Sequence, residues 1–145
     1  MDCQPPGISS NTKGGLSMSK ILVVDDSRTI RTIIRRILIE LGYEVCEAGN
    51  GVEALRVIEA EGAAVKLVLA DWNMPEMNGL EMLKQLRRNP ALSALKVVMV
   101  TTEAELGHMV SALEAGANEY VMKPFTKDIL RQKLEIIGIF PVGVA

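Results

Sequence analysis

Three acidic residues stand directly after short apolar runs, and this feature limits most strongly how the chain can fold. Residues 21–24 are followed by Asp25 and Asp26, and residues 67–70 are followed by Asp71. Runs that are apolar on both faces are typical of parallel strands covered by helices on both sides. The carboxyl ends of such strands meet at one crevice, where open α/β sheets hold their chemistry. We therefore expect the three carboxylates to lie close together.

Strand-like and helix-like segments alternate from residue 20 onward. Each short apolar segment is followed by apolar residues spaced for one face of an α-helix. The expected strands are residues 21–24, 44–47, 67–70, 96–100 and 119–122. The expected helices run from 28 to a stop at Gly42, from 52 to a stop at Gly62, over 80–87, over about 104–115 and over about 126–137. Five such units predict a doubly wound α/β fold, with a five-stranded parallel sheet and helices on both faces.

The chain of 145 residues, 48% of them hydrophobic, has the size of one domain with a real core. Residues 1–19 are rich in proline, glycine and polar residues, which predicts a disordered leader or an extension outside the fold. Residues 20–138 form the expected domain. Residues 139–145 are an unusually apolar C-terminal tail, which either packs on the body, contacts a partner or reflects an altered reading frame.

Charge and hydropathy exclude several classes of protein. The formal net charge of −2 gives no basic footprint, so direct nucleic-acid binding is not expected. The longest apolar run, residues 136–145, is far shorter than the ~20 residues that a membrane span needs. The amino end lacks a secretion signal, which indicates a cytoplasmic protein. In that compartment Cys3 and Cys46 are expected to be free thiols.

A resemblance to a known family rests on residues at the strand ends and on two short motifs. These residues are Asp25-Asp26, Asp71, Thr101, Lys123-Pro124, Trp72-Asn73-Met74-Pro75 and Glu119-Tyr120-Val121-Met122-Lys123-Pro124-Phe125. The set closely resembles the receiver domain of two-component response regulators, especially the single-domain chemotaxis type. The match covers about residues 20–138. It implies a flavodoxin-like fold and a phosphoacceptor switch rather than an ordinary enzyme, one that promotes its own phosphotransfer and dephosphorylation.

The resemblance implies an aspartyl-phosphate site that works with Mg²⁺. Asp71 would accept the phosphoryl group from a histidine kinase. Asp26, Asp71 and the backbone carbonyl of Asn73 would bind the metal directly, and Asp25 would bind it through a water. The chemistry agrees, because a carboxylate that attacks phosphorus needs cations around it, and Mg²⁺ prefers oxygen ligands.

Two further side chains complete the implied site. Lys123 offers an ammonium that can pair with Asp71 before phosphorylation and with a phosphoryl oxygen afterwards. Thr101 offers a hydroxyl to another phosphoryl oxygen. The Lys123-Pro124 bond is expected to be cis by resemblance, and the alternative is an ordinary trans proline at the first position of a helix.

Switching and dephosphorylation are also expected by resemblance. Tyr120 would fill the space that opens when Thr101 moves, unless it is a static, half-buried aromatic residue. The target would dock on the face made by the expected fourth helix, fifth strand and fifth helix, and a flagellar motor switch is one candidate. Asn73, Thr102 and Glu103 would tune the access of water to the acyl phosphate.

Other interpretations remain open from sequence alone. Adjacent aspartates before a helix often only cap its amino end. Trp72 is expected to be a partly exposed neighbour of the metal site, and His108 is expected to be an exposed surface residue. The chain could be a receiver fragment of a longer regulator or kinase, or a stand-alone phosphate sink. An aspartyl-phosphate phosphatase of the haloacid dehalogenase type fits less well, because it needs an Asp-x-Asp pattern where this chain has Asp25-Asp26-Ser27.

Overall fold

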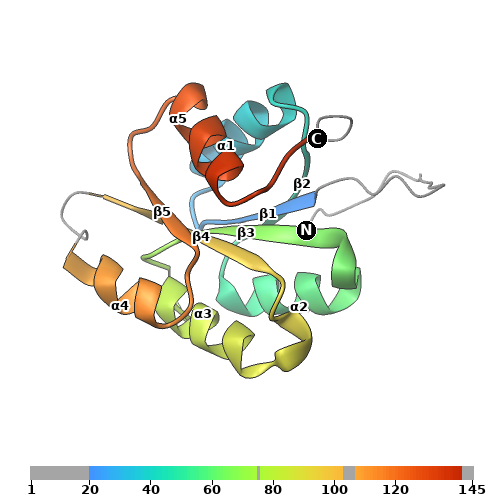
Figure 1. Cartoon of the computed structure of the whole chain (residues 1–145), viewed down its shortest axis with the longest axis vertical. Coiled ribbons are helices and arrows are strands. Elements are labelled where there is room, and N and C mark those ends of the chain that lie inside the picture. Colours follow the sequence, from blue (N-terminus) through green and yellow to red (C-terminus); the bar gives the residue numbers. More distant parts are fainter. Residues whose placement is uncertain (1–19, 75, 103–106, 142–145) are drawn as a thin grey trace.

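The protein is described by a computed structural model that covers residues 20–74, 76–102 and 107–141. A five-stranded parallel sheet lies between two layers of helices (Figure 1). Its strands, in the spatial order β2-β1-β3-β4-β5, are β1 Lys20–Val24, β2 Glu44–Ala48, β3 Val65–Asp71, β4 Lys96–Thr101 and β5 Glu119–Met122. The predicted fold class is confirmed.

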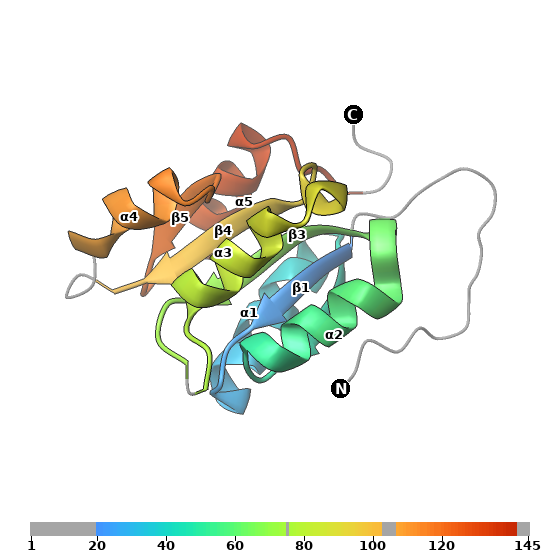
Figure 2. The ribbon, with the colours of Figure 1, turned by 90° about the horizontal axis from the view of Figure 1, so that it is seen from below.

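Helices cover both faces of the sheet. They are α1 Arg28–Glu40, α2 Gly51–Glu61, α3 Gly79–Arg88, α4 Met109–Glu114 and α5 Lys127–Ile136, with short 3-10 turns at η2 Gly62–Ala64 and η3 Pro90–Leu92. α1 and α5 lie on one face, and α2, α3 and α4 lie side by side on the other (Figures 1 and 2). Within the described ranges, none of these helices has the length and apolar content needed to cross a bilayer.

The central strands are continuously apolar because each contributes to two cores. In β1, Ile21 and Val23 pack under α1 and α5, while Leu22 and Val24 pack against the layer of α2, α3 and α4. β3 alternates in the same way. Successive side chains of a strand point to opposite faces, so a strand covered on both sides needs apolar residues throughout.

The first helix shows how the local sequence sets an element's bounds. The hydroxyl of Ser27 accepts a hydrogen bond from the backbone N–H of Ile30 at 3.2 Å and so caps the start of α1. Ile34 and Leu38 form its fully buried stripe. The predicted stop is confirmed at Gly42, whose φ of 101° lies in the left-handed region that glycine tolerates best.

The fourth helix is shorter than predicted. α4 begins at Met109, whereas the spacing of apolar residues predicted a helix from about residue 104. Residues 104–106 of that expected segment, and Glu103 before it, lie outside the described part of the chain. The difference arises at Gly107 and His108, which precede the α-helix, and a glycine inside a helix is unfavourable by ~1 kcal/mol relative to alanine.

One prediction about the cysteines is wrong. Cys46 is fully buried in β2, but it is disulfide-bonded rather than a free thiol. The prediction was based on the size of the core and on a reducing compartment, which together indicate that the fold does not need a disulfide. They do not indicate whether two sulfur atoms lie close enough to bond. Cys3 lies outside the described residues, as do the rest of the expected leader and residues 142–145.

The start of the apolar tail packs on the body. Ile139 is buried in the core of α1 and α5, and its carbonyl accepts a hydrogen bond of 2.7 Å from the hydroxyl of Tyr43. Burial raises the pKa of Tyr43 from 10.0 to about 12, and the charge of Glu135 adds to the effect. This phenol is therefore held in its neutral, donating form.

Gly79 allows the third helix to approach the end of β3. A Cβ added at Gly79 would lie 2.7 Å from the carbonyl oxygen of Asp71, 3.2 Å from Cα of Trp72 and 2.5 Å from Cε of Met99. The backbone N–H of Gly79 donates to the carbonyl of Trp72 at 3.0 Å. Two of the three clashing atoms belong to the backbone and cannot move as a side chain end can. Only glycine fits at this contact.

We expect Tyr43→Phe to remove a pH-dependent part of the stability. The unfolded phenol ionises near pH 10 and the folded one near pH 12, so its contribution is complete below pH 10 and is lost as the pH rises through 12. At pH 7 the variant should lose about 1 kcal/mol with the hydrogen bond. Urea unfolding at several pH values measures both effects. Tyr120→Phe is the control, and parallel profiles for wild type and Tyr43→Phe would contradict the prediction.

Gly79→Ala should destabilise the fold by about 1–3 kcal/mol, because the new Cβ forces the backbone near Asp71 to move. Gly107→Ala is the matched control, since nothing lies within 4 Å of a Cβ added there. Urea denaturation of both variants gives the comparison. Equal stability of the two variants would show that the approach of α3 to β3 is not as tight as described.

Candidate functional site

Three carboxylates converge at the carboxyl ends of β1 and β3. Asp25 and Asp26 follow β1, Asp71 is the last residue of β3, and the two strands are direct neighbours in the sheet. One carboxylate oxygen from each aspartate lies within 4.8 Å of the others. Asp25 and Asp71 are buried and Asp26 is exposed. The expected convergence of the aspartates is therefore observed.

Lys123 reaches the same place from the end of β5. Its ammonium Nζ lies 3.4 Å from Oδ1 of Asp71 and 3.5 Å from Oδ2 of Asp25. The backbone N–H of Lys123 donates to the carbonyl of Thr101 at 2.7 Å, and the Lys123-Pro124 peptide bond is cis, as the resemblance implied. One ammonium thus offsets the charge of two buried carboxylates, which are unfavourable in a protein interior without such a partner.

Only one of the two carboxylate oxygens of Asp25 accepts a hydrogen bond from the described residues. Its Oδ1 accepts a hydrogen bond of 2.9 Å from the backbone N–H of Ser27, and its backbone carbonyl accepts one of 2.6 Å from Arg31. Its buried Oδ2 accepts no hydrogen bond from the described residues. The ammonium of Lys123, 3.5 Å away, offsets the charge of this oxygen without a hydrogen bond, and a water bound to a hard cation would supply the missing donor. The residues present therefore fit a magnesium ion.

Thr101 lies at the end of β4 with no exposed surface. Its hydroxyl donates to the carbonyl of Thr102 at 3.2 Å, so in this structure the hydroxyl is turned along its own chain. Thr102 is half-buried and Asn73 is exposed on the loop after β3. Glu103 lies outside the described residues, so the structure places only two of the three residues expected to tune hydrolysis.

Tyr120 is half-buried on β5, at the edge of the sheet. The ammonium of Lys133 on α5 lies 4.8 Å from the centre of the Tyr120 ring and also pairs with Glu119 at 3.3 Å. The ring also packs against the core of α2, α3 and α4, so it lies at the face that the resemblance connects to output.

Trp72 differs from its prediction. The side chain is 8% exposed and packs in the core of α2, α3 and α4, whereas a partly exposed neighbour of the metal site was expected. Strand alternation explains the difference, because the residue after Asp71 points to the opposite face of the sheet. His108 is exposed as predicted, but its ring stacks on Trp72 with centroids 5.1 Å apart and planes 11° apart. Sequence patterns gave no sign of this contact.

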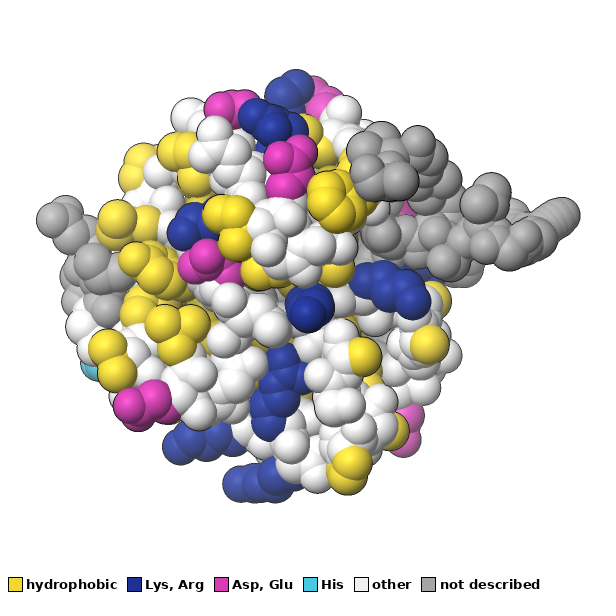
Figure 3. Space-filling model, in the orientation of Figure 1, with side chains coloured by type: hydrophobic (Ala, Val, Ile, Leu, Met, Phe, Trp, Pro, Cys, Tyr) yellow, Lys and Arg dark blue, Asp and Glu magenta, His cyan; other side chains and the backbone are white. Residues whose placement is uncertain are grey.

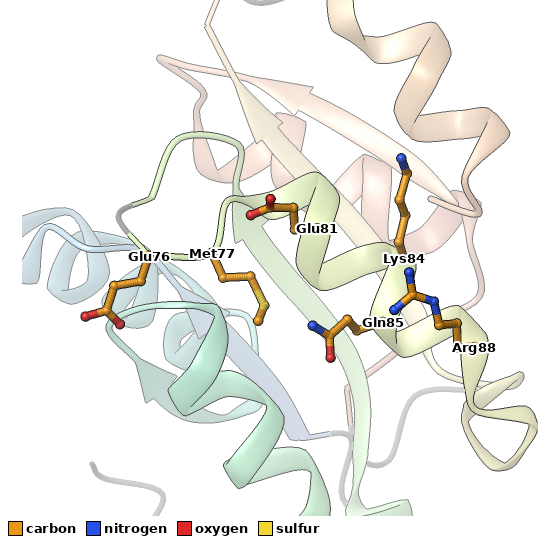
Figure 4. Close-up of a pocket in the computed structure, with 6 residues that line it drawn as sticks. All are labelled: Glu76, Met77, Glu81, Lys84, Gln85 and Arg88. Atoms are coloured by element: carbon orange, nitrogen blue, oxygen red, sulfur yellow. The ribbon is translucent and has the colours of Figure 1, made fainter.

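A hollow of about 360 Å³ lies elsewhere on the surface (Figure 4). It follows α3 and the loop before it, and none of the three aspartates lines it. Its lining residues are Glu76, Met77, Glu81, Lys84, Gln85 and Arg88. The converging carboxylates are therefore a separate site at the strand ends.

Comparison with known proteins agrees with this arrangement. The sequence model of the response regulator receiver domain matches residues 21–135. The chemotaxis protein CheY1 of Helicobacter pylori is 47% identical over 119 residues, which are 81% of this chain and 95% of that protein. The chemotaxis protein CheY homolog of Campylobacter jejuni is 47% identical over 80% of this chain and 89% of its own length.

A solved structure shows the same fold. The chemotaxis protein CheY4 of Vibrio cholerae is 33% identical and superimposes with a TM-score of 0.76, over 83% of this chain and 98% of that one. Receiver domains are phosphoacceptor signalling domains that bind Mg²⁺ at an acidic pocket, and this structure has the corresponding cluster of aspartates. From its sequence, its fold and the residues at its strand ends, the chain belongs to the response regulator receiver domain family.

Proposed function

We propose that this protein is a phosphorylation-dependent signalling switch of a two-component system, with Asp71 as the phosphoacceptor. The observation that carries the proposal is the position of the Asp71 carboxylate, beside Asp25 and Asp26 and 3.4 Å from the ammonium of Lys123. A nucleophilic carboxylate must meet a phosphoryl group that is itself negatively charged. Cationic groups at the point of attack lower that repulsion.

The donor is the phosphohistidine of a histidine kinase. A carboxylate oxygen of Asp71 forms a bond to phosphorus while the bond from phosphorus to the histidine nitrogen breaks. Mg²⁺, held by Asp26, Asp71 and the backbone carbonyl of Asn73, with Asp25 acting through a water, would neutralise charge on the phosphoryl oxygens. Lys123 supplies the second cationic contact, because its ammonium already lies beside Asp71.

Output uses Thr101 and Tyr120. The hydroxyl of Thr101 can turn from the carbonyl of Thr102 to a phosphoryl oxygen, and Tyr120 then moves into the space released. In the proposed switch, Asn73, Thr102 and Glu103 tune the access of water to the acyl phosphate. This chain therefore promotes its own phosphotransfer and dephosphorylation without being a conventional enzyme.

The target docks on the face of α4, β5 and α5. Hydrophobic side chains gather over α4 and β5 (Figure 3). The exposed ones on these three elements are Val110, Leu113, Met122, Ile129 and Ile136. The relatives described above are named chemotaxis proteins, which supports a role in chemotaxis. We further propose that the protein works in the cytoplasm and that its target is a flagellar motor switch.

Incubation with acetyl phosphate and magnesium should add one phosphoryl group to the wild-type protein, measured by intact mass. Asp71→Asn should show no gain, and omission of magnesium should abolish the gain in wild type. Asp128→Asn, at an exposed carboxylate on α5, is the control that should behave as wild type. A full gain in Asp71→Asn would reject Asp71 as the phosphoacceptor.

Tyr120→Ala should leave phosphorylation by acetyl phosphate intact and weaken target binding by about tenfold, because the ring belongs to output rather than to the reacting groups. The binding measurement uses a peptide from a flagellar motor switch protein and the protein with beryllofluoride and magnesium. Lys133→Met tests whether the cation beside the ring matters separately. Equal loss of phosphorylation and binding in Tyr120→Ala would contradict the assigned role.

A further inference from the structure

We propose that His108 is a positioning residue of the switch, which holds the first turn of α4 against Trp72 and so opposes activation. The inference rests on the proposed function, because Trp72 is the neighbour of the phosphoacceptor Asp71. Its basis is the stack of the two rings, with centroids 5.1 Å apart and an interplanar angle of 11°. The chain contains one tryptophan and one histidine, and they are these two residues.

Trp72 is fixed on the sheet side of this contact. Its backbone N–H donates to the carbonyl of Val100 in β4 at 3.1 Å, and its own carbonyl accepts from Gly79 at 3.0 Å. Its side chain is buried. Movement of Trp72 therefore requires movement of β3, β4 or the start of α3, and the indole is a rigid platform for the ring of His108.

His108 is the movable partner. It is exposed and directly precedes α4, but its side chain makes no capping hydrogen bond to that helix. The helix itself has two buried anchors, Met109 and Ala112, and presents Val110 and Leu113 to solvent. The stack therefore adds a third anchor at the amino end of α4.

Through Trp72, the stack links the end of β4 with the start of α4. Trp72 binds β4 through its backbone and the start of α4 through its ring. The stack coexists with the hydrogen bond from the Thr101 hydroxyl to the carbonyl of Thr102. Drawing that hydroxyl toward a phosphoryl oxygen pulls on the end of β4, while the stack holds α4 in place. His108 therefore stabilises the arrangement that phosphorylation must leave.

Two substitutions separate stacking from simple coverage of Trp72. His108→Leu replaces the imidazole with an apolar side chain of similar size that covers the indole without a ring, whereas His108→Phe keeps a ring that can stack. Ser111→Ala is the control at an exposed position of α4. Affinity for beryllofluoride with magnesium is measured on the full chain by calorimetry, and hydrogen exchange is measured for the amides of α4.

His108→Leu should bind beryllofluoride about three- to tenfold more tightly than wild type, because removing an aromatic stack destabilises the arrangement that opposes binding. Its α4 amides should exchange faster when no beryllofluoride is present. His108→Phe and Ser111→Ala should match wild type in both measurements. A purely structural role would change exchange in α4 without changing the affinity.

Unchanged or weaker binding in His108→Leu would overturn the proposal, as would His108→Phe behaving like His108→Leu. Absence of beryllofluoride binding in wild type would instead reject the proposed function. The two failures are therefore distinguishable, since the first requires wild-type binding.

Discussion

The placement of like charges at one edge of a buried sheet governs the rest of this structure. Asp25 and Asp71 are both buried, and both face the ammonium of Lys123 at 3.5 and 3.4 Å. Burial penalises an uncompensated carboxylate by far more than a surface ion pair can return, so the lysine must be positioned accurately. The order β2-β1-β3-β4-β5 brings these residues together from three separate strands. The core, with its helices on both faces, provides the rigidity that keeps the charges in place.

The charge of the three aspartates is only partly compensated by Lys123. Three carboxylates face one ammonium at this edge, and Oδ2 of Asp25 accepts no hydrogen bond from the described residues. The excess negative charge favours a divalent cation, and a cation in turn makes room for a phosphoryl group that bare carboxylates would repel. The negative charge of the aspartates, which must be compensated in the folded protein, is therefore the same charge that would attract a metal ion.

Sequence reasoning succeeded where a local pattern determines the outcome. The double-faced apolar runs and the helical spacing predicted the sheet, and strand ends predicted the meeting of Asp25, Asp26 and Asp71. It failed where tertiary contacts decide, as with the buried ring of Trp72 and the disulfide-bonded Cys46. No sequence pattern singled out the contact made by Gly79. Its close approach to the carbonyl of Asp71 depends on how α3 packs, and no local pattern encodes that distance.

Strand alternation connects Asp71, the proposed phosphoacceptor, to the opposite layer of the molecule. Leu67 and Leu69 share a core with α1 and α5, while Val68, Ala70 and Trp72 pack toward α2, α3 and α4. Asp71 therefore presents its carboxylate at the crevice while the next side chain enters the core below α4. A displacement at the end of β3 moves both groups together, because they share one peptide unit. The short distance between the proposed phosphoacceptor and the layer of α4 thus follows from the twofold period of a β-strand, and it requires no chain of intermediate residues.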